Sequence, residues 1–302
     1  MQIKVSVIIP TYKNPLTVGR AIDSVLNQEN FNAYEIIVVD DNDPKSKERN
    51  LTEQALEKYK NDIRVKYIKH PYNKNGAAAR NTGFANSIGK YIAFLDDDDV
   101  FLKNKLRLQY NYMEKHPEFG ASYTWRVQRH NDIVRYSKTG DLTKDILLLD
   151  FFPTTITIMM RRECFEGING FDETFRRHQD FEFLLRFFEK YEIGVVPAVL
   201  SRIIGKDTVG NHLCGKQYEE LKLKFFNTFL PIINKLDIQN PGFKKRVYAS
   251  HYADVFVSEV ASKEFRRAFI LFIKGIKICG GIFVNRIVKH YITAIQRRRN
   301  HK

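Results

Sequence analysis

Residues 91–99 read YIAFLDDDD, a run of apolar and aromatic residues that stops abruptly at four aspartates. A continuous run of this kind predicts a strand buried on both faces, as in a parallel sheet. Three more β-rich runs precede it, at residues 5–10, 35–39 and 65–69, and helical patterns or turn formers separate them. This alternation predicts an α/β fold with a mainly parallel central sheet flanked by helices.

Polar side chains follow three of these predicted strands. Thr11 and Tyr12 follow the first, Asp40 and Asp41 follow the second, and the aspartates at residues 96–99 follow the fourth. Ligands of open α/β sheets bind outside the carboxyl ends of the strands. We therefore expect the three strand ends to form one ligand-binding crevice.

The four aspartates are the strongest local signal in the chain. Adjacent carboxylates repel one another, and Mg²⁺ or Mn²⁺ relieves that repulsion because such cations prefer oxygen ligands. An N-cap for a helix near residue 102 is the alternative, although one aspartate would suffice for it. The pair Asp40 and Asp41 has two open interpretations, either hydrogen bonding to a base or ribose or the construction of a turn.

Two more residues are candidates for chemistry. Arg80 follows the small residues 76–79 and could contact phosphate oxygens, although a surface arginine is the alternative. Asp180 precedes an apolar helix predicted over residues 180–190, where it could be an N-cap or a general base. The sequence contains neither GxxxxGK[ST] nor GxGxxG, which argues against a P-loop NTPase and a Rossmann dehydrogenase.

Taken together, these motifs resemble the family 2 glycosyltransferases with the GT-A fold. The resemblance spans residues 3–200 and rests on stretches in the family's order, at residues 5–14, 21–28, 35–41, 79–83 and 94–99. It implies a non-processive, inverting transfer of a sugar from a nucleotide sugar, with UDP expected. The implied acceptor is a saccharide or lipid-linked saccharide in bacterial surface-polysaccharide synthesis (capsule, O-antigen or teichoic acid). No Gln-x-x-Arg-Trp motif occurs, which argues against a processive synthase.

The resemblance also implies roles for individual residues. Asp180 would be the catalytic base, and Asp98 would bind Mn²⁺ or Mg²⁺. Gln179 departs from the glutamate that the family usually has before the base. The nucleotide-sugar donor would be bound by Pro10, Thr11, Tyr12, Asp41, Asn75, Arg80, Asp96 and Asp97. The metal would offset charge on the leaving nucleoside diphosphate while Asp180 deprotonates the acceptor in a single displacement.

Two other functions remain open at this point. A nucleotidyltransferase would also need metal-binding aspartates but would release pyrophosphate, and a catalytically inactive sugar-nucleotide-binding protein would release no nucleoside diphosphate. The donor sugar, the acceptor and the linkage depend on loops over residues 124–157 and 205–215, which show no pattern. His178 and His212 lie near the expected acceptor side.

The net charge of +14 is concentrated near the C-terminal end. The last 41 residues hold eleven Lys or Arg and one Glu, a net charge of +10, so the first 261 residues carry only +4. Basic residues share one side of the predicted helices and bulky apolar residues the other, which favours an anionic membrane surface as partner. Packing on the rest of the protein or in a homo-oligomer is the alternative. Nucleic acid is not expected, because no recognition module is present.

We therefore expect a glycosyltransferase domain over residues 1–215 and a helical, basic region over residues 216–302. No uninterrupted apolar run reaches the length of a membrane span, and the N-terminal residues show no signal-peptide pattern. These features favour a cytoplasmic protein peripheral to the inner face of the cell membrane. Cys164, Cys214 and Cys279 fit no disulfide or zinc spacing and are expected to be reduced.

Overall fold

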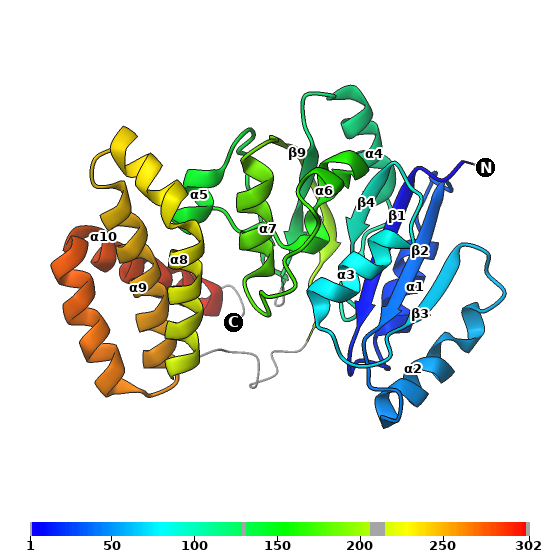
Figure 1. The fold of residues 1–302 in the computed structure, drawn as a ribbon, viewed down its shortest axis with the longest axis horizontal. Helices are drawn as coiled ribbons and strands as arrows, with labels where there is room; N and C mark the ends of the chain where they lie inside the picture. The colour runs from blue at the N-terminus through cyan, green and yellow to red at the C-terminus, as the bar shows by residue number, and fades with distance from the viewer. Residues whose placement is uncertain (1, 129–130, 206–214, 300–302) are drawn as a thin grey trace. The chain divides into compact units, whose positions relative to one another are not determined.

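A computed structural model describes residues 2–128, 131–205 and 215–299 (Figure 1). The chain forms two compact units. The first, called the α/β unit here, comprises Met1–Thr143 and Phe152–Lys206, and the second, called the helical unit, comprises Lys144–Phe151 and Asp207–Lys302. The segment Lys144–Phe151, which we predicted within the first domain, thus groups with the C-terminal helices.

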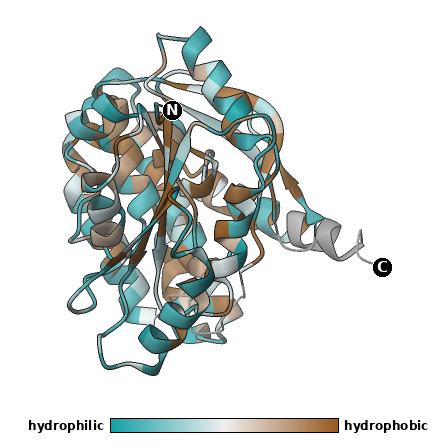
Figure 2. Cartoon of the chain, turned by 90° about the vertical axis from the view of Figure 1, so that its right-hand side faces the viewer, coloured by the Kyte–Doolittle hydropathy of each residue, from teal (hydrophilic) through white to brown (hydrophobic). Residues whose placement is uncertain are grey.

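Nine strands among the described residues form one mixed sheet in the α/β unit. The strands are β1 (Val5–Thr11), β2 (Tyr34–Asp40), β3 (Val65–Lys69), β4 (Tyr91–Phe94), β5 (Val100–Phe101), β6 (Ala121–Val127), β7 (Ile133–Val134), β8 (Met159–Arg161) and β9 (Ile193–Arg202). Their order is β3-β2-β1-β4-β8-β6-β9-β5, and β7 pairs with β6. The strands are mainly in the hydrophobic colour in Figure 2, as their runs of Val and Ile require.

The predicted parallel sheet is one half of this mixed sheet. Strands β3, β2, β1 and β4 are parallel, with Val7 of β1 opposite Ile36 and Ala93. In the other half β6 and β9 are parallel, whereas β8 is antiparallel to β4 and β6, and β5 is antiparallel to β9. The α/β fold class is confirmed. The sequence pattern over residues 155–160 predicts one more strand. This is wrong in its first half, because Thr155–Thr157 forms a 3₁₀ turn and β8 begins at Met159.

Helices cover both faces of the parallel half. Side chains Val5, Val7 and Ile9 of β1 join a core with α1, while Ile8 points to the other face and meets α3. The helices of this unit are α1 (Val18–Leu26), α2 (Lys47–Leu56), α3 (Gly76–Ala85), α4 (Lys105–Lys115), α6 (Arg162–Gly167) and α7 (Gln179–Phe188). The sequence pattern predicts helices near residues 18–26, 51–59, 77–87, 102–114 and 180–190, and α1, α2, α3, α4 and α7 lie within a few residues of these places.

The helical unit contains α8 (Gly215–Gln239), α9 (Phe243–Ala261) and α10 (Phe265–Arg299), and α5 (Thr143–Leu147) lies at the boundary. Helix α9 contacts both α8 and α10 (Figure 1). The sequence pattern predicts two separate helices, over residues 264–278 and 285–299. The structure joins them into α10 across non-helical backbone at Cys279. Arg286 of α10 pairs with Asp150 at 2.9 Å and donates to the Leu149 carbonyl, which ties residues 144–151 to this unit.

One helix of the described chain, over Phe265–Ile292, is long and apolar enough to cross a membrane by length and composition alone. This corrects the expectation that no segment reaches that length, which counted uninterrupted apolar residues and so stopped at each lysine. Length and composition are weak indicators, and the kink at Cys279 divides this stretch. Cys164 and Cys279 are free thiols, and Cys214 lies outside the described residues.

Gly83 allows α3 to approach β1. A Cβ atom at this position would overlap the Ile8 side chain. We therefore expect Gly83→Ala to lower the free energy of unfolding by about 1–3 kcal/mol, measured by urea denaturation. Gly19→Ala in α1 is the matched control, because its Cβ would meet only the Tyr59 hydroxyl at 3.5 Å, and it should cost nothing. A Gly83→Ala protein as stable as the wild type would contradict this packing.

Candidate functional site

The carboxyl ends of β1, β2 and β4 meet as predicted. Strand β1 lies between the other two, and the Asp41 amide donates to the Thr11 carbonyl at 2.9 Å. The amide of Tyr12, which follows β1, donates to a carboxylate oxygen of Asp97 at 3.2 Å. The three polar segments are therefore joined by direct hydrogen bonds at one edge of the sheet.

The four aspartates separate into an inner and an outer pair. Asp97 and Asp99 are buried, whereas Asp96 and Asp98 are half-buried. Asp97 accepts hydrogen bonds from the Tyr12 amide and from Asn14 Nδ2, and Asp99 accepts from the amides of residues 204 and 205. Burial raises the pKa of each inner carboxyl to about 7. The inner pair thus anchors neighbouring loops, and the outer pair is accessible to a ligand.

The segment after β9 lies against the outer pair. A Cβ atom on Gly205 would overlap the Asp98 carboxylate, so a larger residue here would push that carboxylate aside. On the other side Arg20 donates to the Asp98 carbonyl at 2.6 Å. Sequence reasoning placed residue 205 only in an undecoded loop, and no local signal linked it to the tetrad.

A divalent cation fits the outer pair with help from a substrate. Among the described residues, no three His, Cys, Asp or Glu side chains gather closely enough to enclose a metal ion. Mg²⁺ is commonly bound by only one or two protein carboxylates together with substrate phosphates. The half-exposed carboxylates of Asp96 and Asp98 could supply the protein ligands of such a site. Phosphate oxygens of a substrate would supply the remaining ligands.

Arg80 links the tetrad to the start of α7, where Asp180 lies. It is 8% exposed, and its guanidinium donates to Asp96 Oδ1 at 2.7 Å and to Gln179 Oε1 at 2.9 Å. Asn75 caps the same helix by accepting from the Ala77 amide, and its Nδ2 donates to the Glu173 carbonyl. Arg80 is therefore a buried bridge between two motifs and not an isolated surface arginine.

Asp180 lies at the far end of this bridge and is half-buried. The Thr155 hydroxyl donates to Asp180 Oδ1 at 2.6 Å. Burial raises the pKa of Asp180, while the charge of Arg80 and the hydrogen bond from Thr155 oppose that rise. The alternative that Asp180 is the N-cap of α7 is wrong, because the cap is His178, with a left-handed backbone conformation. Thr155 was missed by sequence reasoning, and His212 lies outside the described residues.

Asp40 and Asp41 serve the protein's own structure. Asp41 is 2% exposed, and its oxygens accept four hydrogen bonds of 2.7–2.9 Å, from His70 Nδ1, Asn73 Nδ2 and the amides of Lys74 and Asn75. Asp40 is fully buried and pairs with Arg49 at 3.1 Å. The turn-building interpretation therefore describes this pair, and contact between Asp41 and a nucleotide stays a prediction.

The remaining predicted donor residues come from β1 and the loop after it. Pro10 is half-buried, Thr11 is buried, and the Tyr12 ring is 40% exposed beside the tetrad. Tyr12 is thus placed to offer an aromatic surface, while Thr11 contributes mainly through its backbone.

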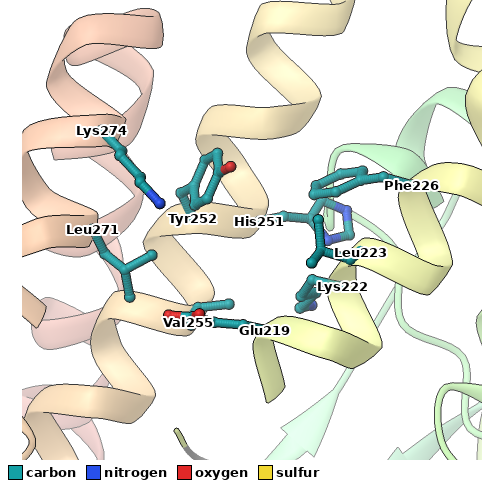
Figure 3. Close-up of a pocket in the computed structure, with 9 residues that line it drawn as sticks. All are labelled: Glu219, Lys222, Leu223, Phe226, His251, Tyr252, Val255, Leu271 and Lys274. Carbon is teal, nitrogen blue, oxygen red and sulfur yellow. The ribbon is translucent and has the colours of Figure 1, made fainter. Parts of the chain in front are cut away.

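A pocket of about 80 Å³ lies within the helical unit (Figure 3). Its lining is mainly apolar and includes Phe226, Tyr252 and Leu271, with the ammonium group of Lys274 turned toward it. No residue of this pocket belongs to the tetrad, the Arg80 bridge or the surroundings of Asp180. It is therefore separate from the predicted site.

Comparisons with known proteins agree on one family. The sequence model described as "Glycosyl transferase family 2" matches residues 6–168. An uncharacterized glycosyltransferase of Rickettsia felis is 33% identical over 66% of this chain and 33% of its own length. The UDP-Glc:alpha-D-GlcNAc-diphosphoundecaprenol beta-1,3-glucosyltransferase WfgD of Escherichia coli is 28% identical over 64% of this chain and 72% of its own. The chain spans about a third of the length of the Rickettsia relatives.

A solved structure shares the fold. S. aureus TarS 1-349, in complex with UDP-GlcNAc, superimposes with a TM-score of 0.60 over 93% of this chain and 90% of that one. The two sequences are 18% identical, so the likeness concerns the fold.

Asp41→Asn tests the structural role of this carboxylate. The amide would turn an N–H₂ group toward protein donors, leaving buried groups unsatisfied, so we expect the free energy of unfolding to fall by about 1–3 kcal/mol. Urea denaturation measures this, with Asp43→Asn at a neighbouring exposed position as the control. Unchanged stability combined with weaker UDP binding would instead assign Asp41 to the nucleotide.

Proposed function

Because the chain belongs to glycosyl transferase family 2, whose sequence model matches more than half of it, we propose that it is an inverting glycosyltransferase. The observation that supports this most is the Arg80 bridge. It joins a half-exposed carboxylate of the tetrad to the start of α7, where Asp180 lies. Donor-binding acids and a base are thus held together at one end of the sheet.

We propose a UDP-linked sugar, a hexose or N-acetylhexosamine, as the donor. The name of WfgD specifies UDP-Glc, and the TarS neighbour was solved with UDP-GlcNAc and with UDP. In this chain the exposed Tyr12 ring could contact the base, and Arg80 and Asp96 could contact the ribose and diphosphate.

We propose that the acceptor is a saccharide or lipid-linked saccharide in surface-polysaccharide synthesis, such as capsule, O-antigen or teichoic acid. WfgD is named for a diphosphoundecaprenol-linked GlcNAc acceptor, and TarP of Staphylococcus aureus for poly(ribitol-phosphate). An acceptor on a lipid carrier would place this protein in the cytoplasm, at the inner face of the cell membrane.

Mn²⁺ or Mg²⁺ is the proposed cofactor, with Asp98 as its main protein ligand and Asp96 beside it. When bound with the donor, such a cation offsets negative charge on the leaving diphosphate. Gly205 leaves the Asp98 carboxylate room to take this position, and Arg80 orients Asp96.

Asp180 acts as the base in this proposal. It accepts the proton of the acceptor hydroxyl while that oxygen bonds to the anomeric carbon and the bond from this carbon to the UDP oxygen breaks. Attack opposite the leaving group inverts the configuration. The Thr155 hydroxyl orients the carboxylate, and the Arg80 charge favours its ionised form by opposing the rise of its pKa.

A panel of nucleotide sugars with Mn²⁺, tested on the wild-type and Asp180→Asn proteins, checks this proposal. We expect the wild type to bind one UDP-sugar and to hydrolyse it slowly, releasing UDP. Asp180→Asn should bind that donor with nearly unchanged affinity and lose transfer by about 100-fold or more, because the proton acceptor is gone. Calorimetry measures binding, and UDP release measures turnover.

Asp62→Asn is the control for this substitution, since Asp62 lies before β3 at the opposite edge of the sheet. It should match the wild type in both assays. Wild-type protein that binds no nucleotide sugar, or that releases pyrophosphate from a nucleoside triphosphate, would overturn the proposed function. An Asp180→Asn protein with most of its turnover would remove Asp180 from the role of base.

The pH dependence of transfer reports on Asp180. A base works only when deprotonated, so kcat/KM should fall as the pH drops through the raised pKa of this carboxyl. Thr155→Val removes a hydrogen bond that stabilises the charged form, so the acid limb should move to higher pH. Profiles of log kcat/KM against pH measure the shift, and Thr228→Val on α8 should leave the limb in place. An unmoved limb in Thr155→Val would show that another group titrates.

A further inference from the structure

The first segment of α10, residues 265–278, presents three distinct faces. Successive residues of an α-helix are 100° apart, so each side chain can be placed around the axis. Ala268, Leu271 and Gly275 share one face and are buried. Phe283 packs against Gly275 and joins Ala249 and Ala253 of α9 in one core cluster. This packing fixes which sides of the segment remain exposed.

The second face, called the apolar flank here, is exposed. It comprises Phe265, Phe269, Phe272, Ile273 and Ile276. Phe265 and Phe269 are each 66% exposed, and the other three are 37–41% exposed. Half of the large hydrophobic side chains exposed in the described residues lie on α10, whereas soluble surfaces usually scatter such residues singly. Within the helical unit, the described residues leave this flank largely uncovered, although the Phe272 ring contacts those of Phe256 and Phe283.

The third face, called the basic flank here, adjoins the apolar flank and holds Arg266, Arg267, Lys274 and Lys277. Helix α10 contains no Asp or Glu, and in the described part of the chain no carboxylate forms an ion pair with these four cations. Arg286 does not belong to this set, because it pairs with Asp150. Arg266 and Lys277 lie next to the apolar flank, whereas Arg267 and Lys274 lie further around the helix, and Lys274 turns toward the pocket described above.

We propose that these two flanks dock the protein on an anionic lipid bilayer. The apolar flank would insert at the boundary between headgroups and acyl chains, and the basic flank would lie among the lipid phosphates. This inference names the surface that would hold the protein at the membrane, and its biological purpose rests on the proposed function. We propose a helix that lies on the membrane surface and does not cross it. One face of the segment packs on the protein's own core, and the helix is interrupted at Cys279.

Charge favours a bilayer over a second copy of the chain. A two-fold dimer buries the same patch on both partners, so it would bring two basic flanks to one apolar contact. With no acidic residue on α10 to pair with them, these cations would repel. Anionic headgroups beside a hydrocarbon layer offer the complementary arrangement.

Vesicle flotation with the full-length protein tests the proposal. The probes are vesicles of phosphatidylcholine alone and of phosphatidylcholine mixed with phosphatidylglycerol. We expect wild-type protein to float only with the anionic vesicles and to dissociate as salt is raised. Phe265→Ser/Phe269→Ser should lower the partition coefficient by about tenfold or more, because two large apolar side chains are lost. Arg266→Gln/Lys277→Gln should lower it by about 25-fold, because each cation near an anionic surface contributes about fivefold.

The control is Ile63→Ser/Ile238→Ser, which removes two side chains that are 102% and 83% exposed and lie outside α10. It should float like the wild type, and circular dichroism should show that all variants are folded. No flotation, equal flotation with neutral vesicles, or full flotation of the phenylalanine variant would overturn the proposal. A dimer in light scattering that the phenylalanine variant dissociates would instead identify a second copy as the partner.

Slow donor hydrolysis in solution separates this proposal from the proposed function. The α10 variants should hydrolyse the donor like the wild type, since none of these residues belongs to the candidate site. Hydrolysis without flotation would refute membrane docking alone, and flotation without hydrolysis would refute only the enzymatic proposal.

Discussion

The candidate site depends on how four adjacent carboxylates are accommodated. Placed together in water they would repel one another, and placed together in a protein interior each would lose its hydration. The fold resolves this by alternating them. Asp97 and Asp99 turn inward and accept hydrogen bonds from the loops after β1 and β9, while Asp96 and Asp98 remain half-exposed. The inward pair thus fastens two loops to the end of β4 and sets the direction of the outward pair.

Arg80 extends this order across the site. It lies in α3, whose close approach to β1 depends on Gly83, and it bridges Asp96 and Gln179. The family that this sequence resembles usually has a glutamate at the position of Gln179. Gln179 is a neutral amide, so it does not neutralise the charge of Arg80 as a glutamate would. More of the positive potential of Arg80 therefore acts on the site and on Asp180. The departure from the family pattern therefore has an electrostatic effect on the proposed base.

Periodicity and strand-end chemistry predicted the part of the site that local sequence controls. The parallel strands, the meeting of their carboxyl ends and the importance of residues 96–99 could all be read from runs and spacing. Thr155 and Gly205 could not, because each reaches the site through a contact between segments far apart in the chain. At Asp41 an acidic strand end suggested a ligand contact, and the sequence did not reveal that nearby backbone amides and His70 hydrogen-bond to the same carboxylate. In the other half of the sheet the sequence predicted strands near β6 and β8 but not β5, β7 or β9. Strands β5 and β7 have only two residues each, too few to show a repeat.

The grouping of residues 144–151 with the C-terminal helices limits how this protein can be divided. The chain passes between the two units three times, and Leu147 and Phe151 are fully buried. His251 of α9 hydrogen-bonds to the Leu147 carbonyl, and Arg286 of α10 holds the residues that follow. Separating the chain near residue 215 would expose the apolar segment 144–151. The helical unit therefore cannot be exchanged by recombination as one continuous stretch of sequence. Evolutionary changes in this unit would have to arise by substitution within it, with the inserted segment changing in step.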